Sequence, residues 1–219
     1  MTSPKSAPDP EKHIAESTVR RLSLYLRVLE QTAQRGQATV SSDALADDGG
    51  TTSAQVRKDL SFFGSFGKRG RGYDVAELVT KLREILGLSR EWKVYIVGAG
   101  KIGAALVSYR GFSERGFRVL AIYDNNPQLV GRMIDGIGVR SMAELARDAV
   151  RETPEIAVIT VPAEFAQTVA DLVVSSGIRA IMNFAPVPLH VPATVTVKSV
   201  NMALELEGLA YALVHRERD

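Results

Sequence analysis

The chain contains no cysteine, and this single absence excludes several chemistries. Disulfide bonds, thiolate metal sites and thiol redox catalysis all need cysteine, and none of the 219 residues supplies one. The absence also agrees with a reducing cytoplasm, which is the localisation that we expect.

Long apolar runs and histidines are scarce as well. No apolar stretch approaches the roughly 20 residues that span a bilayer. Residues 1–12 are polar and proline-rich and lack the apolar core of a secretory signal, so we expect a disordered leader there. The three histidines, His13, His190 and His215, do not have the spacing of metal ligands, and we predict neither a metal site nor a catalytic histidine.

The formal net charge is only +2, but basic residues gather in one segment. Between Ser53 and Gly72 there are five basic residues and a single acid, Asp59, which gives this segment a charge of +4. The basic residues are Arg57, Lys58, Lys68, Arg69 and Arg71. A basic patch in a near-neutral chain indicates a nucleic-acid partner better than the overall charge does.

Residues 13–88 have the periodicity of a helical domain. Apolar residues at helical spacing predict a first helix that starts at Ser17 or Thr18 and stops at Gly36. Ser41 can cap a short second helix, which the glycines at 49 and 50 end.

The next segment completes the pattern of a winged helix-turn-helix domain. Thr51 or Thr52 can cap a helix over residues 53–62, and the glycines spaced through residues 64–72 predict a hairpin with a basic tip. A last helix is predicted over residues 75–86.

An inward apolar stripe on the third helix, Val56, Leu60 and Phe63, leaves polar side chains for the major groove of DNA. The predicted DNA contacts are Ser53, Gln55, Arg57, Lys58 and Ser61 on the helix and Lys68, Arg69 and Arg71 at the hairpin tip. The alternative is a small helical subdomain with a solvated charged face, and the pattern by itself leaves both open.

Residues 89–200 alternate between short β-branched runs and helical stretches. The predicted strands are residues 94–97, 119–123, 156–159 and 180–182, and the predicted helices are residues 102–109, 141–150 and 163–175. This alternation predicts an α/β fold in which a doubly wound, mainly parallel sheet of the Rossmann type follows the helical domain.

A dinucleotide-binding fingerprint, G-x-G-x-x-G, follows the first of these strands and opens a helix. Gly98 makes the tight turn, Gly100 lets the backbone approach the pyrophosphate, and Gly103 lets the helix pack against the strand. The intervening residues of the predicted pyrophosphate site are Ala99, Lys101 and Ile102. The motif in this context predicts NAD(H) as cofactor, and a glycine-rich turn that binds no ligand is the alternative.

Asp124 ends the second strand, 21 residues after Gly103. A carboxylate there can accept hydrogen bonds from the adenosine ribose and repels a 2′-phosphate, which favours NAD(H) over NADP(H), although it can also merely cap a turn. Later strands are followed by Thr160, Val161 and Pro162 and by Asn183, which are predicted to line the nicotinamide end unless they serve only as loop residues.

The chain has no room for a substrate domain. A dehydrogenase needs a proton donor near the nicotinamide and a domain that holds its substrate. After the sheet only residues 201–219 remain, and they predict one leucine-rich helix. We therefore predict that the protein is not an enzyme and that this helix packs on a second subunit, with packing on its own domain as the alternative.

Several stretches together resemble the Rex family of redox-sensing transcriptional repressors over about residues 14–215. They are residues 21–27 (RLSLYLR), 56–67 (VRKDLSFFGSFG), 70–74 (GRGYD), 109–112 (YRGF) and 183–186 (NFAP), together with the fingerprint at Gly98. The resemblance implies a homodimer of winged-helix and Rossmann domains that exchanges its C-terminal helices. It also implies a repressor of inverted-repeat operator DNA that NADH releases.

The resemblance further implies roles for single residues. Arg57, Lys58 and the hairpin tip would contact DNA, and Arg27 and Tyr109 would couple the domains near the nicotinamide. Some family members have an acid at the position of Asn201, where it can pair with the residue that matches Arg27. Because an uncharged amide makes a weaker bond, we expect weaker discrimination between NADH and NAD⁺.

Three other functions stay open at this point. The chain could be an NAD-dependent oxidoreductase with a helical accessory domain, a DNA-binding protein whose Rossmann domain is structural, or a regulator that reads another nucleotide ligand.

Overall fold

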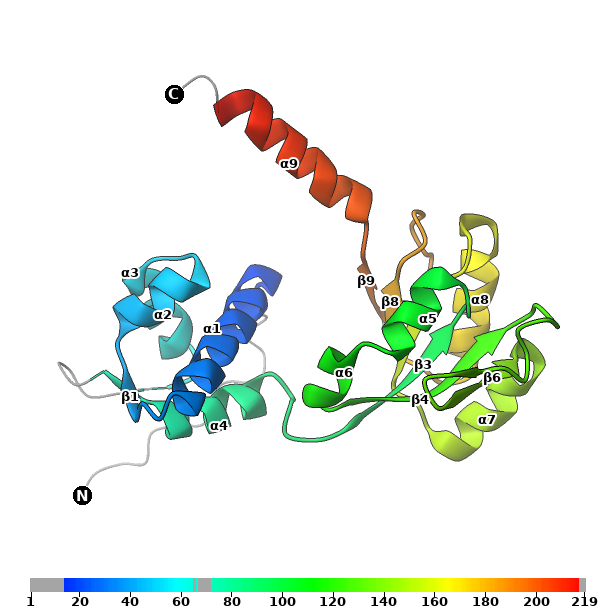
Figure 1. Cartoon of the computed structure of the whole chain (residues 1–219), viewed down its shortest axis with the longest axis horizontal. Coiled ribbons are helices and arrows are strands. Elements are labelled where there is room, and N and C mark those ends of the chain that lie inside the picture. The colour runs from blue at the N-terminus through cyan, green and yellow to red at the C-terminus, as the bar shows by residue number, and fades with distance from the viewer. Residues whose placement is uncertain (1–13, 65, 67–71, 217–219) are drawn as a thin grey trace. The chain divides into compact units, whose positions relative to one another are not determined.

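The computed structural model describes residues 14–64, 66 and 72–216, and the chain separates into two compact units (Figure 1). The first unit ends at Arg90 and the second begins at Glu91. The predicted leader and the hairpin tip with Lys68, Arg69 and Arg71 lie outside the described residues.

The first unit combines four helices with two short strands in its described part. In chain order these are α1 (Glu16–Gln34), β1 (Thr39–Val40), α2 (Ser42–Gly49), α3 (Ser53–Ser61), β2 (Tyr73–Asp74) and α4 (Val75–Ile85). Two predicted caps are confirmed, because Ser41 Oγ accepts from the Ala44 N–H at 3.1 Å and Thr52 Oγ1 accepts from the Gln55 N–H at 3.2 Å. The predicted start of α1 at Ser17 or Thr18 is wrong by one or two residues.

One apolar core holds these helices together. α1 contributes Leu22, Leu26 and Leu29, and α4 contributes Leu78 and Leu82. All five side chains are at most 1% exposed, and burying a leucine contributes about 1.5–3 kcal/mol. Leu45 of α2 and Val56 and Leu60 of α3 lie in the same core, and their burial, more than intrinsic helix propensity, stabilises these two short helices.

The two short strands pair antiparallel, with Val40 opposite Tyr73. Gly72 leads into β2 with a φ of +75°, and a Cβ there would meet the Val40 carbonyl oxygen at 2.5 Å. Glycine is therefore required where the chain returns from the predicted hairpin to the helical core.

The second unit is the predicted doubly wound sheet. Its strands are β3 (Trp92–Val97), β4 (Phe117–Asp124), β5 (Met133–Ile134), β6 (Ile137–Ser141), β7 (Ile156–Ile159), β8 (Ala180–Asn183) and β9 (Thr196–Ser199). They lie in the order β5-β6-β4-β3-β7-β8-β9, and every neighbouring pair except β5 and β6 is parallel. The order reverses between β3 and β7, and ligands bind at such switch points.

Helices cover both faces of this sheet (Figure 1). They are α5 (Lys101–Val107), α6 (Arg110–Glu114), α7 (Leu145–Glu152, after a 3₁₀ turn at Met142–Glu144) and α8 (Ala163–Ser175). One face buries Tyr95 with Leu145 of α7 and Val173 of α8, and the other buries Ile96 beside Leu106 of α5. Burial on both faces explains why the strands read as continuous apolar runs.

The β5–β6 hairpin, β9 and α6 were absent from the sequence prediction. β5 has only two residues, and β6 (IGVRS), β9 (TVKS) and α6 (RGFSE) mix apolar residues with polar residues or glycine. They therefore lack the short apolar runs by which the equally short β7 and β8 were predicted.

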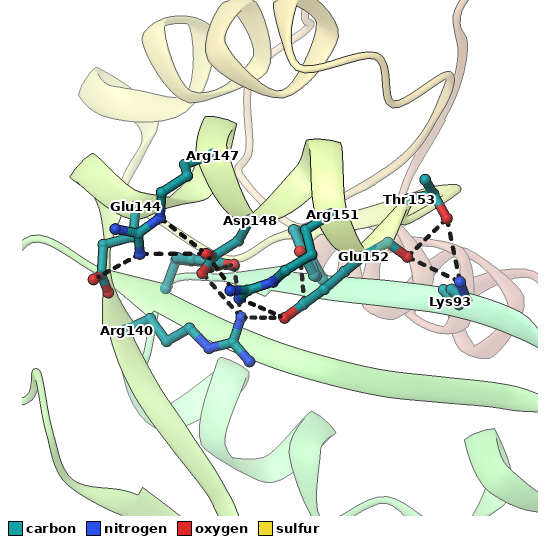
Figure 2. A network of polar contacts seen from close by, with 10 residues as sticks. Lys93, Arg140, Glu144, Arg147, Asp148, Arg151, Glu152 and Thr153 are labelled. Carbon is teal, nitrogen blue, oxygen red and sulfur yellow. Dashed lines mark hydrogen bonds and ion pairs between the residues drawn. The ribbon is translucent and has the colours of Figure 1, made fainter.

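A charged network lies between the sheet and α7 (Figure 2). Arg140 of β6 donates to Asp148 and to Glu152 of α7, both at 2.9 Å. Two tyrosines on the neighbouring strands complete it, because Tyr123 donates to Asp148 at 3.2 Å and Tyr95 donates to Glu152 at 2.7 Å. The network therefore ties α7 to three adjacent strands.

Both carboxyl groups of the network have lowered pKa values. Burial by itself would raise the pKa of Asp148 and of Glu152. Hydrogen bonds from Arg140 and the two tyrosines outweigh the burial and hold both pKa values below their ordinary range. The two carboxylates therefore stay charged within the fold.

α9 (Met202–Arg216) corresponds to the predicted leucine-rich helix. Asn201 caps it, because the Ala203 N–H donates to Asn201 Oδ1 at 3.0 Å. The large apolar side chains from Met202 to Val214 are 58% to 68% exposed, so α9 buries little of this surface on the described part of its own chain. No helix among the described residues is both long and apolar enough to cross a membrane.

The variant Asp148→Asn tests the charged network. Because the Asp148 pKa is lower in the folded chain, its charge stabilises the fold above about pH 4, and this contribution is lost as pH falls through the folded-state pKa. At pH 7 we expect a loss of about 2 kcal/mol, less than for a fully buried pair because Arg140 keeps Glu152 and is 30% exposed.

Urea unfolding at pH 7 and at pH 3 measures this effect. The difference between wild type and Asp148→Asn should shrink at the lower pH. Glu144→Gln, which breaks only an exposed pair with Arg147, is the control and should cost less than about 0.5 kcal/mol. An equal loss at both pH values would contradict an electrostatic origin.

Candidate functional site

A cavity of about 400 Å³ lies at the carboxyl ends of β3, β4 and β7, where the strand order reverses. Its lining includes Gly98 and Gly100 after β3, residues 124–126 after β4 and residues 160–162 after β7. Parallel strands end at the same edge of a sheet, and the fold therefore brings these separate segments together.

Two glycines of the loop, Gly98 and Gly103, lie in contacts that leave no room for a side chain. Gly98 has a φ of +107°, and a Cβ there would meet Thr160 Oγ1 at 2.7 Å. A Cβ on Gly103 would overlap the Gly98 carbonyl oxygen. Thr160 Oγ1 donates to that same oxygen at 2.8 Å, so the threonine after β7 fixes the loop after β3.

Gly100 is different, because the fold itself does not require a glycine there. Its φ of −69° is ordinary, and a Cβ would meet no atom within 4 Å. Since Gly100 lines the cavity, the missing side chain leaves space for a ligand to approach the backbone, as a pyrophosphate does. Lys101 and Ile102, whose side chains are exposed, begin α5 directly after it.

Asp124 holds the glycine loop from the neighbouring strand. Its Oδ2 accepts from the Ala99 N–H at 2.7 Å, and its Oδ1 accepts from the Asn126 N–H at 2.7 Å. Each carboxylate oxygen has two lone pairs, so both can accept a further hydrogen bond from a ligand. Asp124 therefore serves as a turn cap, and it can still bind ribose hydroxyl groups.

The remaining lining is largely apolar. Leu129, Met142, Val161, Pro162 and Phe165 line the cavity, and the Phe165 ring is 56% exposed at the first turn of α8. A carboxylate beside an apolar slot suits a flat base that carries a ribose. The sequence prediction missed Leu129, Met142 and Phe165. Each is an apolar residue a few positions after a strand, and nothing else in the sequence marks it as part of a binding site.

Six predicted cofactor residues do not line this cavity: Ala99, Lys101, Ile102 and Gly103 of the glycine loop, and Asn183 and Tyr109. Asn183 is fully buried, and its amide nitrogen donates to the carbonyl oxygens of Ala185 and Val187 at 3.2 and 2.8 Å. Its side chain therefore holds the loop after β8. Tyr109 lines a second cavity of about 400 Å³, together with Phe112 of α6 and the start of β4.

In the first unit, the exposed face of α3 carries the predicted cations. Arg57 and Lys58 are exposed, and Arg57 Nη1 donates to Ser42 Oγ at 2.8 Å. Ser61 Oγ donates to the Lys58 carbonyl oxygen at 2.7 Å, and Ser53 is half-buried in the first turn. Arg27, the predicted coupling residue, is exposed on α1.

Asp59 does not belong to this exposed face. Its carboxylate is 1% exposed and accepts two hydrogen bonds from Arg21, at 2.6 and 2.8 Å, one from the Tyr25 hydroxyl at 3.0 Å and one from Gln55 Nε2 at 2.7 Å. Burial would raise the pKa of Asp59, but the hydrogen bonds from Arg21, Gln55 and Tyr25 outweigh it and lower that pKa. The acid of the basic segment is thus neutralised inside the unit.

Among the described residues, no group of three or more His, Cys, Asp or Glu side chains is arranged to hold a metal ion.

Two known domain families match the chain. Residues 13–61 match the family described as "Putative DNA-binding protein N-terminus", and residues 89–187 match the "CoA binding domain".

Full-length relatives extend the similarity over nearly the whole chain. The redox-sensing transcriptional repressor Rex of Desulfitobacterium hafniense is 44% identical over 198 residues, which cover 90% of this chain and 94% of that protein. The Streptomyces coelicolor repressor of the same name is 46% identical over 205 residues, which cover 94% of this chain and 78% of that protein.

Solved structures of RSP, a Rex-family repressor, have the same fold. RSP is 34% identical to this chain with a TM-score of 0.86, and the match covers 94% of this chain and 97% of RSP. RSP in complex with β-NAD⁺ and operator DNA is 35% identical with a TM-score of 0.89, over 94% of this chain and 95% of that one. A further structure contains RSP with β-NADH, at a TM-score of 0.85 and 34% identity over 94% and 97% of the two chains.

Alanine substitutions at Gly103 and Gly100 test which of these glycines the fold itself requires. Gly103→Ala forces a methyl group onto the Gly98 carbonyl, and we expect it to lower the free energy of unfolding by about 3 kcal/mol. Gly100→Ala meets open space, and we expect a change within about 1 kcal/mol. Urea unfolding of both variants checks this pair, and a similar loss in both would show that the close approach at Gly103 is not the controlling contact.

Proposed function

This chain belongs to the Rex family of redox-sensing transcriptional repressors, and we propose that it binds operator DNA as a dimer and is released when NADH binds. The observation that carries the nucleotide part of the proposal is the cavity at the switch point. There, Gly100 leaves open space beside a fixed loop while Asp124 stands at the end of the next strand.

The residues of the cavity fit NAD(H). In this proposal the loop from Gly98 to Gly103, with Ala99, Lys101 and Ile102, faces the pyrophosphate, and Asp124 accepts from the adenosine ribose. Val161 and Pro162 line the same cavity as Asp124, so we place the segment 160–162 at the adenosine half and not, as the sequence suggested, at the nicotinamide end. When bound, the cofactor supplies a nicotinamide that is positively charged in NAD⁺ and neutral in NADH.

The DNA part of the proposal rests on α3. Arg57 and Lys58 are exposed on a short capped helix, as in a recognition helix, and its buried face carries Val56 and Leu60 beside the ion-paired Asp59. We assign the phosphate and base contacts to Ser53, Gln55, Arg57, Lys58 and Ser61 and, from the sequence, to Lys68, Arg69 and Arg71.

Release by NADH follows from linkage. A ligand shifts the DNA affinity only through its different affinities for the DNA-competent and released states, so operator DNA must weaken NADH binding by the same factor. We assign the coupling to Arg27, Tyr109 and Asn201, and because the Asn201 amide is uncharged we expect weak discrimination between NADH and NAD⁺.

We further propose a homodimer that acts in the cytoplasm and has no enzymatic activity. The relatives carry the names of repressors, and the exposed apolar surface of α9 needs a cover. Exchange of α9 with the second subunit would supply it.

A second candidate ligand is another adenine nucleotide. The match of residues 89–187 to a CoA binding domain favours it, because coenzyme A shares the ADP moiety. Its ribose carries a 3′-phosphate, which the carboxylate of Asp124 would repel, and we therefore prefer NAD(H).

A mobility-shift titration with an inverted-repeat operator tests the proposal. We expect NADH to release the DNA from the wild type while NAD⁺, NADPH and coenzyme A act only at higher concentrations. Gly100→Ala should bind the operator as the wild type does and should need at least roughly tenfold more NADH. Operator binding that no nucleotide changes would leave the Rossmann unit with a structural role only.

Light scattering of α9 variants tests the dimer. Met202, Leu206, Leu209 and Leu213 share one face of the helix, and replacing Leu206 and Leu209 by Gln should convert the dimer to monomers without unfolding either unit. Both side chains are more than 60% exposed in the single chain, so their loss costs the monomer little. Glu207→Gln is the control, and a double variant that stays dimeric would place the interface elsewhere.

A further inference from the structure

The amide of Gln55 is held in one orientation by a buried carboxylate. Gln55 lies in the first turn of α3, and its Nε2 donates to Asp59 Oδ1 at 2.7 Å. Asp59 is buried and ionised, and the hydrogen bonds from Arg21 and Tyr25 hold its carboxylate in place. An ionised carboxylate can only accept hydrogen bonds, so the amide nitrogen, and not the amide oxygen, must point toward it.

The amide oxygen of Gln55 consequently points away from the buried cluster. In the described part of the chain, no side-chain oxygen or nitrogen is both buried and without a hydrogen-bond partner. Gln55 is half-buried, and no residue of the described chain donates to its Oε1. The oxygen therefore reaches solvent, and Gln55 lies three residues before the exposed Lys58 on α3, a spacing at which helical side chains are neighbours.

This orientation changes what Gln55 can recognise. A free glutamine amide binds adenine with two hydrogen bonds, one donated to N7 and one accepted from the 6-amino group. With its nitrogen committed to Asp59, Gln55 offers only an acceptor. In the major groove, only the amino groups of cytosine and adenine donate, whereas guanine and thymine present acceptors or a methyl group.

We propose that Gln55 is a specificity-determining residue that reads one base of each operator half-site by accepting a hydrogen bond from an exocyclic amino group. This inference rests on the proposed function, because it needs α3 in the major groove. It selects adenine or cytosine against guanine and thymine, without distinguishing the first two. Asp59 is the positioning residue, since it decides which end of the amide faces the DNA.

Selection of binding sites from random DNA tests the inference. The wild type should select a half-site in which one position is restricted to adenine or cytosine. In Gln55→Met, which keeps the length of the side chain and removes the acceptor, that position alone should become unrestricted. Operators with a guanine or thymine there should bind the wild type about tenfold more weakly and should bind the variant as well as the selected operator.

Two further variants make the result decisive. Gln55→Ala also removes the acceptor and should give the same relaxed position if Gln55→Met folds poorly. Gln31→Met, an exposed position near the end of α1, should leave the selected site unchanged. An unchanged half-site in both Gln55 variants, or a position restricted to adenine alone in the wild type, overturns the inference while the repressor function stands. A wild type that selects no sequence overturns the proposed function and the inference together.

Discussion

The close approach of α5 to the glycine loop is the contact on which the second unit depends. The backbone at Gly103 lies against the Gly98 carbonyl oxygen, and Thr160 Oγ1 donates to the same atom. The start of α5 and the distant segment after β7 therefore meet at one oxygen atom of the glycine loop. Because this contact fixes the loop without any help from a ligand, the cavity beside Gly100 is formed in advance, and a ligand does not have to pay for ordering it.

Buried carboxylates perform a comparable task in each unit. Asp59 links α3 to α1, and Asp148 links α7 to β6 through Arg140. Arg140 pairs across the sheet with Tyr123, whose neighbour is the cavity residue Asp124. Buried ion pairs add little net stability compared with apolar packing. Here they mainly fix positions, because each carboxylate accepts hydrogen bonds from several donors on other elements. Asp59 thereby fixes α3, which carries the predicted DNA contacts, and Asp148 fixes α7 against the sheet.

The sequence predicted the helices of the first unit, four strands of the sheet and the glycine loop, because each follows from local spacing or from a residue with special backbone freedom. Asn183 shows what that reasoning leaves out. An asparagine at the end of a strand was predicted to line the nicotinamide end, and its amide also donates to the loop carbonyls of Ala185 and Val187, which only the folded loop supplies. Gln55 was predicted to face DNA, and the sequence did not show that its amide nitrogen binds Asp59. Asp59 is in turn held by Arg21, which lies 38 residues away in the chain. Long-range partners of this kind leave no periodic signal.

The arrangement of the cavity separates affinity from discrimination. NADH and NAD⁺ share the adenosine and pyrophosphate that Asp124, the glycine loop and the apolar wall around Phe165 would hold, and they differ only at the nicotinamide ring. Contacts to the shared half stabilise both complexes equally, so they cannot distinguish NADH from NAD⁺. In the proposed mode of binding, the residues beside the nicotinamide would have to supply the discrimination between the two nucleotides. Tyr109 lines a different cavity of the same unit, and Asn201 caps α9 after the last strand. In the proposed mode of binding, these two residues are the candidates for sensing the charge of the nicotinamide ring.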